Sequence, residues 1–127
     1  MATDQARTHA ITQSNLDEFA EISGDDNPIH VDPGYAAGTP FRLPVAHGMF
    51  LFSLVRAELR RRWPLAQLTE QRLVFTAPTP AGAVVSVRLA TIEDDGRRLR
   101  VDTRVVSEDG SVGLQGESVL DRPGVDA

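Results

Sequence analysis

The segment from residue 46 to residue 63 limits what this chain can fold into more than any other part of it. The segment reads AHGMFLFSLVRAELRRRW, and only Gly48, in the expected first turn, disfavours a helix. Pro64 follows directly and would end a helix. The first half of the segment is apolar all round, which is typical of a helix buried on most sides. The rest of the chain must therefore enclose this helix.

Strand patterns fill the chain after this helix. Apolar and polar residues alternate over residues 85–89 and 98–105, and apolar runs occur within residues 71–77 and 112–120. The turn sequences Asp94-Asp95-Gly96 and Asp109-Gly110 separate the later runs. We predict an antiparallel meander with one buried face. Such a sheet must wrap the long helix, which is an α+β fold.

Short elements are expected before the long helix. Residues 7–12 predict a short first strand, and Ser14 is a candidate N-cap for a short helix that Gly24 would end. That helix would carry acidic residues in its first turn and an apolar face; these are Asp17 and Glu18, and Phe19, Ala20 and Ile22. Four prolines and two glycines within residues 27–44 predict a loop, with one helical turn over residues 34–37.

Composition limits the class of protein. The chain of 127 residues has 13 basic and 18 acidic residues, a net charge of −5, and lacks lysine and cysteine. It therefore has no lysine nucleophile, no disulfide and no thiolate metal site. Arginines and aromatic residues do not interleave in a basic stripe, so nucleic acid is not an expected partner. The three histidines are far apart in the sequence, which predicts no metal site, and no cofactor is implied.

A single domain over residues 1–127 is expected, with loose ends over residues 1–6 and from about Asp121 onward. The first residues lack the apolar core of a signal peptide, and no apolar run approaches membrane-spanning length. We therefore expect a soluble, cytoplasmic protein that does not interact with a membrane.

The segment SGDDNPIHVD, residues 23–32, carries the chemistry. It places Asp25 five residues before His30, and Asn27-Pro28 restricts the loop between them. Isolated loop residues of these types are usually solvated turn residues. Here, however, Ile29 and Val31 would bury the loop and desolvate its polar groups. A carboxylate and an imidazole held in such a loop are suited to proton transfer.

A second group lies downstream, where His47-Gly48 opens the long helix. The N-terminus of a helix presents free N–H groups and a partial positive charge, which suit a developing oxyanion. A carboxylate, an imidazole and an oxyanion site are the groups that proton transfer beside a carbonyl requires.

The sequence resembles the MaoC-like, (R)-specific enoyl-CoA hydratase family, which has the hot-dog fold. The resemblance rests on SGDDNPIHVD, on the AHG motif that begins at Ala46, and on Phe75, Pro78 and Gly82 at the family's spacing. It covers most of the chain, from about residue 16 to residue 119. It implies one sheet wrapped around a central helix, and a thioester substrate.

The resemblance also implies roles for three residues. Asp25 and His30 would hold and activate one water that adds across the C2–C3 double bond of a trans-2-enoyl thioester. Gly48 would donate its main-chain N–H to the thioester carbonyl. The product would be an (R)-3-hydroxyacyl thioester, and the same groups would serve the reverse dehydration. Which of Asp25 and His30 moves which proton stays open, since the two are coupled.

Three other residues near the motifs are further candidates for the site. For Asn27 the preferred interpretation is a side chain that fixes the loop. For His47 it is a hydrogen-bonded histidine that holds the loop onto the helix. Ser53 is expected to bond a preceding carbonyl, with a position facing the acyl tunnel as the alternative.

The chain departs from the family pattern at two positions. Ala83 stands where an aspartate is common, and we expect this to affect a turn. Arg56 stands where a small polar residue is common, and an inward Arg56 would narrow or charge the acyl pocket. The run at residues 60–62 is interpreted as a solvated helix end that suits the helix dipole, with phosphate binding as the alternative.

Several functional interpretations stay open at this point. The preferred one is a homodimeric hydratase acting on an acyl-CoA, since an open sheet edge favours pairing with a second sheet. A polyketide-type dehydratase acting on an acyl-carrier-protein thioester shares the fold. A non-catalytic half of a heterodimer would not need both Asp25 and His30. A thioesterase would need a carboxylate on the long helix, for which Glu58 is the candidate.

Overall fold

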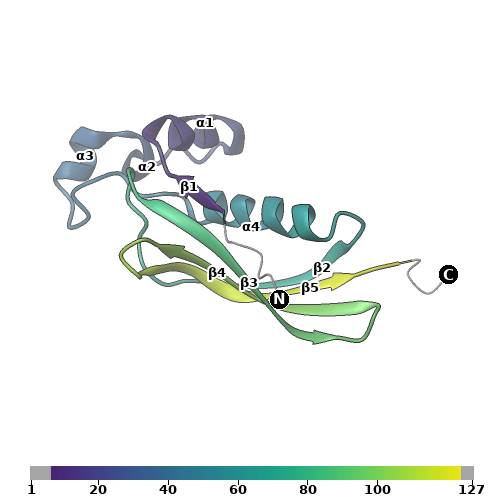
Figure 1. Cartoon of the computed structure of the whole chain (residues 1–127). Coiled ribbons are helices and arrows are strands. Elements are labelled where there is room, and N and C mark those ends of the chain that lie inside the picture. The colour runs from purple at the N-terminus through teal and green to yellow at the C-terminus, as the bar shows by residue number, and fades with distance from the viewer. Residues whose placement is uncertain (1–6, 124–127) are drawn as a thin grey trace.

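The computed structural model describes residues 7–123. In chain order the elements are β1 (Thr8–Ala10), α1 (Gln13–Ser23), α2 (Pro28–Val31), α3 (Pro33–Ala37), α4 (Gly48–Arg62), β2 (Gln67–Phe75), β3 (Val84–Asp94), β4 (Arg98–Ser107) and β5 (Val112–Asp121). The helix α4 lies along one face of a curved sheet, and α1, α2 and α3 gather at one end of the molecule (Figure 1). The predicted α+β arrangement, a sheet around one long helix, is confirmed.

The strands form one antiparallel sheet in the order β1-β3-β4-β5-β2. β3, β4 and β5 make the predicted meander, but β2 pairs with β5 and not with β3. The segment between β2 and β3 contains Pro78, Pro80 and Gly82, so it cannot form a tight hairpin and instead crosses to the other side of the sheet. Gly116 of β5 allows β2 to approach, because a Cβ there would lie 1.8 Å from the Arg72 carbonyl oxygen.

One face of α4 packs against the sheet. Leu51, Val55 and Leu59 recur at four-residue spacing and are almost completely buried. The sheet contributes side chains from alternate strand positions on the face that is turned toward α4. These buried residues include Val87, Leu99, Val101, Val105 and Leu114. The prediction that the first half of α4 is buried on most sides is only partly correct within one chain, because Met49 is 53% exposed.

Helix α4 begins at Gly48, two residues later than predicted, and ends at Arg62 before Pro64. Its start is delayed because the chain is still extended at residues 45 and 46. Val45 forms a β-bridge with Pro80, and the Ala46 N–H donates to the Thr79 carbonyl at 2.8 Å. The helix therefore starts from a segment that is held against the β2–β3 connection.

Helix α1 differs from the prediction at its start and on its buried face. Its N-cap is Thr12 and not Ser14, because the Thr12 and Asn15 side chains each accept from the other's main-chain N–H. Asp17 and Glu18 consequently lie beyond the first turn. Leu16 and Ala20, one turn apart, are the buried residues of the helix.

Ile22 was predicted to be buried but is 76% exposed. It lies two residues after Ala20, which turns it about 200° around the helix and away from the core. The other two apolar residues predicted for this face fit it, with Ala20 buried and Phe19 partly buried. Gly24 ends α1 as predicted, with φ of 81°.

The predicted loop over residues 27–44 contains more helix than expected. The sequence predicts the turn α3 but not the turn α2, because four prolines and two glycines in this segment indicate a loop. Pro28 occupies the first helical position of α2, where its missing N–H costs nothing, and the Asn27 side chain caps that turn.

The expected loose ends lie partly outside the described residues, since residues 1–6 and 124–127 are not described. The C-terminal boundary is later than predicted. Asp121 belongs to β5, and the Arg122 N–H donates to the Arg97 carbonyl at 2.8 Å. No helix within residues 7–123 is both long and apolar enough to cross a membrane.

Candidate active site

Asp25 and His30, the predicted catalytic pair, face one another across the end of α1 and the turn α2. Asp25 Oδ2 lies 3.7 Å from His30 Nε2, and the side chains are 55% and 13% exposed respectively. This separation is too long for a direct hydrogen bond and is of the length that a water molecule can bridge.

The end of α1 places Asp25. Gly24 adopts the left-handed conformation that ends the helix and turns the chain, and its N–H donates to the Ala20 carbonyl. The Asp25 N–H then donates to the Ser23 hydroxyl at 3.1 Å. These local bonds point the Asp25 side chain toward α2.

The turn α2 places His30, and a tertiary hydrogen bond orients its ring. His30 Nδ1 lies 2.7 Å from the main-chain carbonyl oxygen of Val45. A carbonyl oxygen only accepts, so Nδ1 carries a hydrogen, and in the neutral ring Nε2 is a lone-pair acceptor. The Gln13 side chain fixes the same turn, because its Nε2 donates to the His30 carbonyl at 2.9 Å.

The neutral His30 ring and the Asp25 carboxylate are therefore both acceptors. Two acceptors cannot bond each other, which accounts for their separation of 3.7 Å. One water molecule between them can donate one hydrogen to each. The arrangement is thus suited to holding a water whose oxygen lone pairs remain free.

His47 is the N-cap residue of α4 and is 2% exposed. Its Nε2 lies 2.9 Å from the Asp25 carbonyl oxygen, so Nε2 carries the hydrogen. This bond is the one that the structural interpretation of His47 expects, since it holds the Asp25 loop onto the start of α4. Burial, the largest effect, lowers the pKa of His47 below its ordinary value, and the neighbouring His30 lowers it further.

Gly48 is the first residue of α4, where the main-chain N–H has no acceptor within the helix. A Cβ at this position would lie 2.7 Å from the Phe75 ring. Glycine therefore lets the end of β2 cover the first turn of α4. The sequence motif contained Phe75 but did not indicate this contact.

These groups line one hollow of about 420 Å³, a size that suits a small-molecule ligand. Asp25, His30, His47 and Gly48 form one side. The other residues are largely apolar and come from α4, the β2–β3 connection and β5; they include Met49, Leu51, Phe75, Pro78 and Thr79. A polar pair and a helix N-terminus at the wall of an apolar hollow are typical of a site for an acyl substrate.

Two of the predicted site residues do not line this hollow. The Asn27 side chain accepts from the Ile29 N–H at 3.1 Å and caps α2, in keeping with its preferred interpretation. The Ser53 hydroxyl donates to the Phe50 carbonyl at 2.6 Å, as expected, and is exposed on α4. Ala83 lies in the turn before β3, with its N–H bonded to the Pro80 carbonyl.

The arginines of α4 and Glu58 lie outside the hollow that contains Asp25. Arg56 is exposed and lines a second hollow instead of the one that contains Asp25. Glu58 is buried, and Arg61 donates to its carboxylate at 3.0 Å, so it is unavailable as a thioesterase carboxylate in this hollow. Residues 60–62 lie in the last turn of α4, where positive charge interacts favourably with the helix dipole, in keeping with the preferred interpretation.

Two of the three histidines, which are far apart in the sequence, lie close together in the fold beside Asp25. Asp25, His30 and His47 each offer one potential ligand atom, and these atoms lie within 4.8 Å of one another. Tertiary contacts bring together residues that are far apart in the sequence. Two of the four imidazole nitrogens, His30 Nδ1 and His47 Nε2, are occupied by main-chain carbonyl oxygens and are not available to a cation.

Sequence reasoning missed several groups of the site. The Val45 carbonyl, which sets the His30 tautomer, has no side-chain signal. Thr79 lines the hollow with a buried hydroxyl that has no hydrogen-bond partner among the described residues. Gln13 was unremarkable as a residue of α1, and only the folded structure shows that it holds α2.

The chain is similar to a known protein family over most of its length. The model of the MaoC-like domain matches residues 1–111. The chain is 38% identical over 117 residues to a 3-hydroxybutyryl-CoA dehydratase from Methylorubrum extorquens, covering 89% of this chain and 74% of that protein. It is 34% identical over 109 residues to an (R)-specific enoyl-CoA hydratase from Aeromonas caviae, covering 83% and 81%.

Solved structures agree with the sequence comparisons. An unliganded R-hydratase from Pseudomonas aeruginosa superposes with a TM-score of 0.88 at 34% identity, covering 97% of this chain and 83% of that one. The (R)-hydratase from A. caviae superposes with a TM-score of 0.83 at 29% identity, covering 97% and 98%. The chain therefore belongs to the MaoC-like family and has the hot-dog fold.

Proposed function

We propose that this chain is a hydro-lyase that adds water to the C2–C3 double bond of a trans-2-enoyl thioester and releases an (R)-3-hydroxyacyl thioester, or catalyses the reverse dehydration. One observation carries the proposal. Asp25 Oδ2 and His30 Nε2 lie 3.7 Å apart as two acceptors in the same hollow as the N-terminus of α4. The named activities of the matched hydratases and dehydratases support it.

The water between Asp25 and His30 supplies both parts of the reaction. Its oxygen forms a bond to C3 while one of its protons passes to the Asp25–His30 pair. The pair gives one proton to C2, so it ends in the protonation state in which it began. The pair titrates as a unit, and the microscopic assignment of each proton stays open.

Gly48 stabilises the charge that develops on the thioester oxygen. Its N–H lies in the first turn of α4, where the helix dipole adds a partial positive charge. Attack at C3 moves electron density through C2 to the carbonyl oxygen. A donor placed at such an oxygen typically contributes about 3 kcal/mol to the transition state.

The chain is proposed to act as a homodimer that pairs along β2. β2 is an edge strand of the sheet, and within the described residues it pairs on one side only, with β5. Val74 and Phe75, the last two residues of β2, are exposed. Met49 of α4 is also exposed and lines the same hollow as Phe75. An open edge with exposed apolar residues is unfavourable unless another strand covers it. Sedimentation equilibrium would measure the mass, and a monomer at micromolar concentration would contradict the proposal.

Hydration of crotonyl-CoA tests the activity, because the absorbance of the conjugated thioester is lost as water adds. We expect turnover without added cofactor, and a product that chiral chromatography identifies as the (R)-3-hydroxy enantiomer. Turnover of a carrier-protein thioester with none of crotonyl-CoA would assign the carrier-bound alternative. A folded protein that hydrates neither thioester would contradict the proposal.

A further inference from the structure

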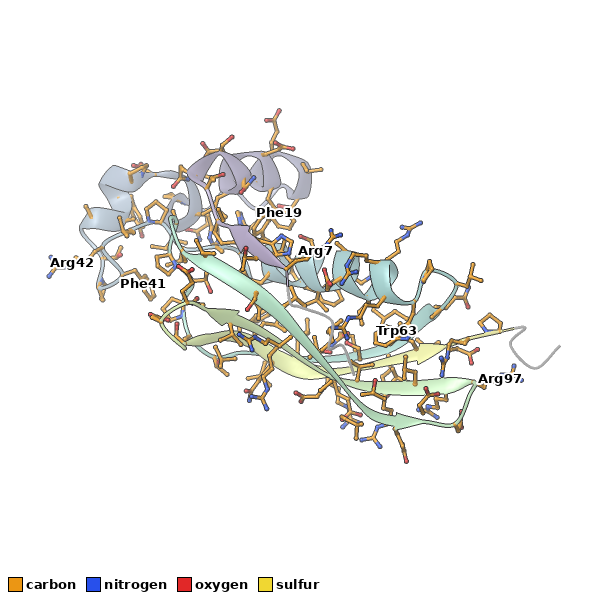
Figure 2. All side chains as sticks on the ribbon, in the orientation of Figure 1. Arg7, Phe19, Phe41, Arg42, Trp63 and Arg97 are labelled. Atoms are coloured by element: carbon orange, nitrogen blue, oxygen red, sulfur yellow. The ribbon has the colours of Figure 1, made fainter. Side chains whose placement is uncertain are left out.

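A second hollow of about 530 Å³ lies at the C-terminal end of α4, between that helix and the start of β2. Arg56 and Arg60, one helical turn apart, line it together with Trp63, Gln67 and Thr69. Figure 2 shows Trp63 at the end of α4 that is remote from Phe19, the residue that packs on His47. The second hollow and the Asp25–His30 hollow therefore lie at opposite ends of the same helix.

Two like charges lie in this hollow, although the net charge of the chain is −5. Arg61, Arg97, Arg100, Arg104 and Arg122 each form an ion pair with a carboxylate. Within residues 7–123 Arg56 and Arg60 form no such ion pair, as is also the case for several other exposed arginines, but these two lie one turn apart in a hollow that no carboxylate lines. Two neighbouring guanidinium groups thus share one hollow without a neutralising partner.

The helix dipole does not account for Arg56. Dipole stabilisation is confined to the last turn of a helix, and Arg56 lies six residues before Arg62, where α4 ends. A guanidinium group presents several N–H donors in a plane and binds carboxylate or phosphate oxygens well. The floor of the hollow is apolar and includes Leu59, Leu68 and Leu120. The hollow is therefore suited to a ligand that combines an apolar segment with an anionic group.

Pairing along β2 would connect the two hollows. A twofold antiparallel contact centred on Gln71, the middle residue of β2, sets Phe75 of one copy beside Gln67 of the second copy. Phe75 lines the Asp25–His30 hollow, whereas Gln67 lines the hollow of Arg56 and Arg60. Each Asp25–His30 hollow would then open toward the arginines of the other copy.

We propose that Arg56 and Arg60 bind an anionic group of the thioester substrate whose double bond lies at the Asp25–His30 site of a second copy of the chain. This inference rests on the proposed hydro-lyase activity and on the proposed dimer. The anion is either a carboxylate at the far end of the acyl chain or a phosphate of the carrier.

Four thioesters distinguish these two sources. Crotonate and a trans-2-enoate with a terminal carboxylate are each supplied as the CoA thioester and as the N-acetylcysteamine thioester, which has no phosphate. Arg56→Gln is expected to lower kcat/KM about 10- to 100-fold for substrates that carry the recognised anion, the loss typical of a hydrogen bond to a charged group. For crotonyl-N-acetylcysteamine, which has neither anion, we expect Arg56→Gln to change kcat/KM less than about threefold.

The pattern of losses gives the assignment. Losses for both carboxylated substrates but not for crotonyl-CoA identify an acyl carboxylate, and losses for both CoA thioesters identify a carrier phosphate. Equal effects on all four substrates, or none, would overturn the inference. A wild-type chain that hydrates none of the four would overturn the proposed function instead, and the inference with it.

Arg88→Gln is the matched control. It removes the same charge from an exposed arginine of β3 that alternates with the buried Val87 and so points away from α4. We expect it to leave kcat/KM for all four substrates unchanged. Thermal unfolding of both variants checks that each retains the fold.

Mixed dimers test whether the arginines act on the other copy. A dimer of one Asp25→Asn chain and one Arg56→Gln chain keeps one site that combines Asp25 from one copy with Arg56 from the other. We expect this dimer to retain wild-type discrimination between the carboxylated and neutral substrates, at about half the wild-type rate. Discrimination like that of the Arg56→Gln homodimer would overturn the assignment to the second copy.

Discussion

The imidazole rings of His30 and His47 stack with centroids 3.8 Å apart and an interplanar angle of 21°. Each ring donates to a carbonyl that lies close in sequence to the other histidine. His30 Nδ1 bonds the Val45 carbonyl, and His47 Nε2 bonds that of Asp25. This reciprocal pair of bonds joins the two motifs into one unit and leaves His30 Nε2 directed toward the Asp25 carboxylate.

The two stacked rings are predicted to adopt different neutral tautomers. Because each donates to a carbonyl oxygen, His30 is expected as the Nδ1–H form and His47 as the Nε2–H form. Nitrogen-15 NMR of the imidazole rings at pH 8 measures this directly. Equal populations of both tautomers for His30 would contradict the proposed position of Nε2 as an acceptor for water.

Protonation of His47 is predicted to destabilise the fold at low pH. Burial lowers the pKa of His47 below the ordinary value of 6.5, so the unfolded chain binds a proton more readily than the folded chain. The contribution to stability is complete above about pH 6.5 and is lost as the pH falls through the lower folded-state pKa. Urea unfolding of the wild type should give a smaller free energy of unfolding at pH 5.0 than at pH 7.5. In His47→Gln this difference should shrink, and an unchanged difference would assign the effect to other groups.

Asp25→Asn is predicted to lower kcat for crotonyl-CoA hydration several hundredfold, within the range of about 10²–10⁴ for loss of a general acid or base. The amide has nearly the same shape, but it cannot accept a proton from the bridging water. Asp26→Asn is the matched control, because it removes an exposed carboxylate from the adjacent position. Similar kcat values for the two variants would contradict the role proposed for Asp25.

Gly48→Ala is predicted to reduce the free energy of unfolding by about 1–3 kcal/mol, because the new Cβ would lie 2.7 Å from the Phe75 ring. Gly38→Ala is the control, since its Cβ would make only an ordinary contact of 3.5 Å. In Gly48→Ala/Phe75→Ala the clash is absent, so the loss should be smaller than the sum of the two single losses. Additive losses in urea unfolding would show that Phe75 does not restrict this position.

Most of the local structure, and the candidate pair Asp25 and His30, could be predicted from the amino-acid sequence. The breaker-free segment before Pro64 produced α4, the alternating runs produced β3 and β4, and Gly24 ended α1 as expected. These features depend on near neighbours, whose periodicity and capping can be read directly. The spacing of Asp25 and His30 also placed both on one short loop segment.

The contacts between distant segments could not be predicted from the sequence. In the folded chain β2 pairs with β5 and not with β3, and His47 stacks on His30, 17 positions away in the sequence. Ile22 is exposed, whereas Leu16 of the same helix is buried. Strand pairing and burial depend on which surfaces pack together after the chain closes its loops, and local pattern does not encode that choice. The His30 tautomer also depends on a tertiary contact. The main-chain carbonyl of Val45 sets it, and a main-chain group leaves no signal in the sequence.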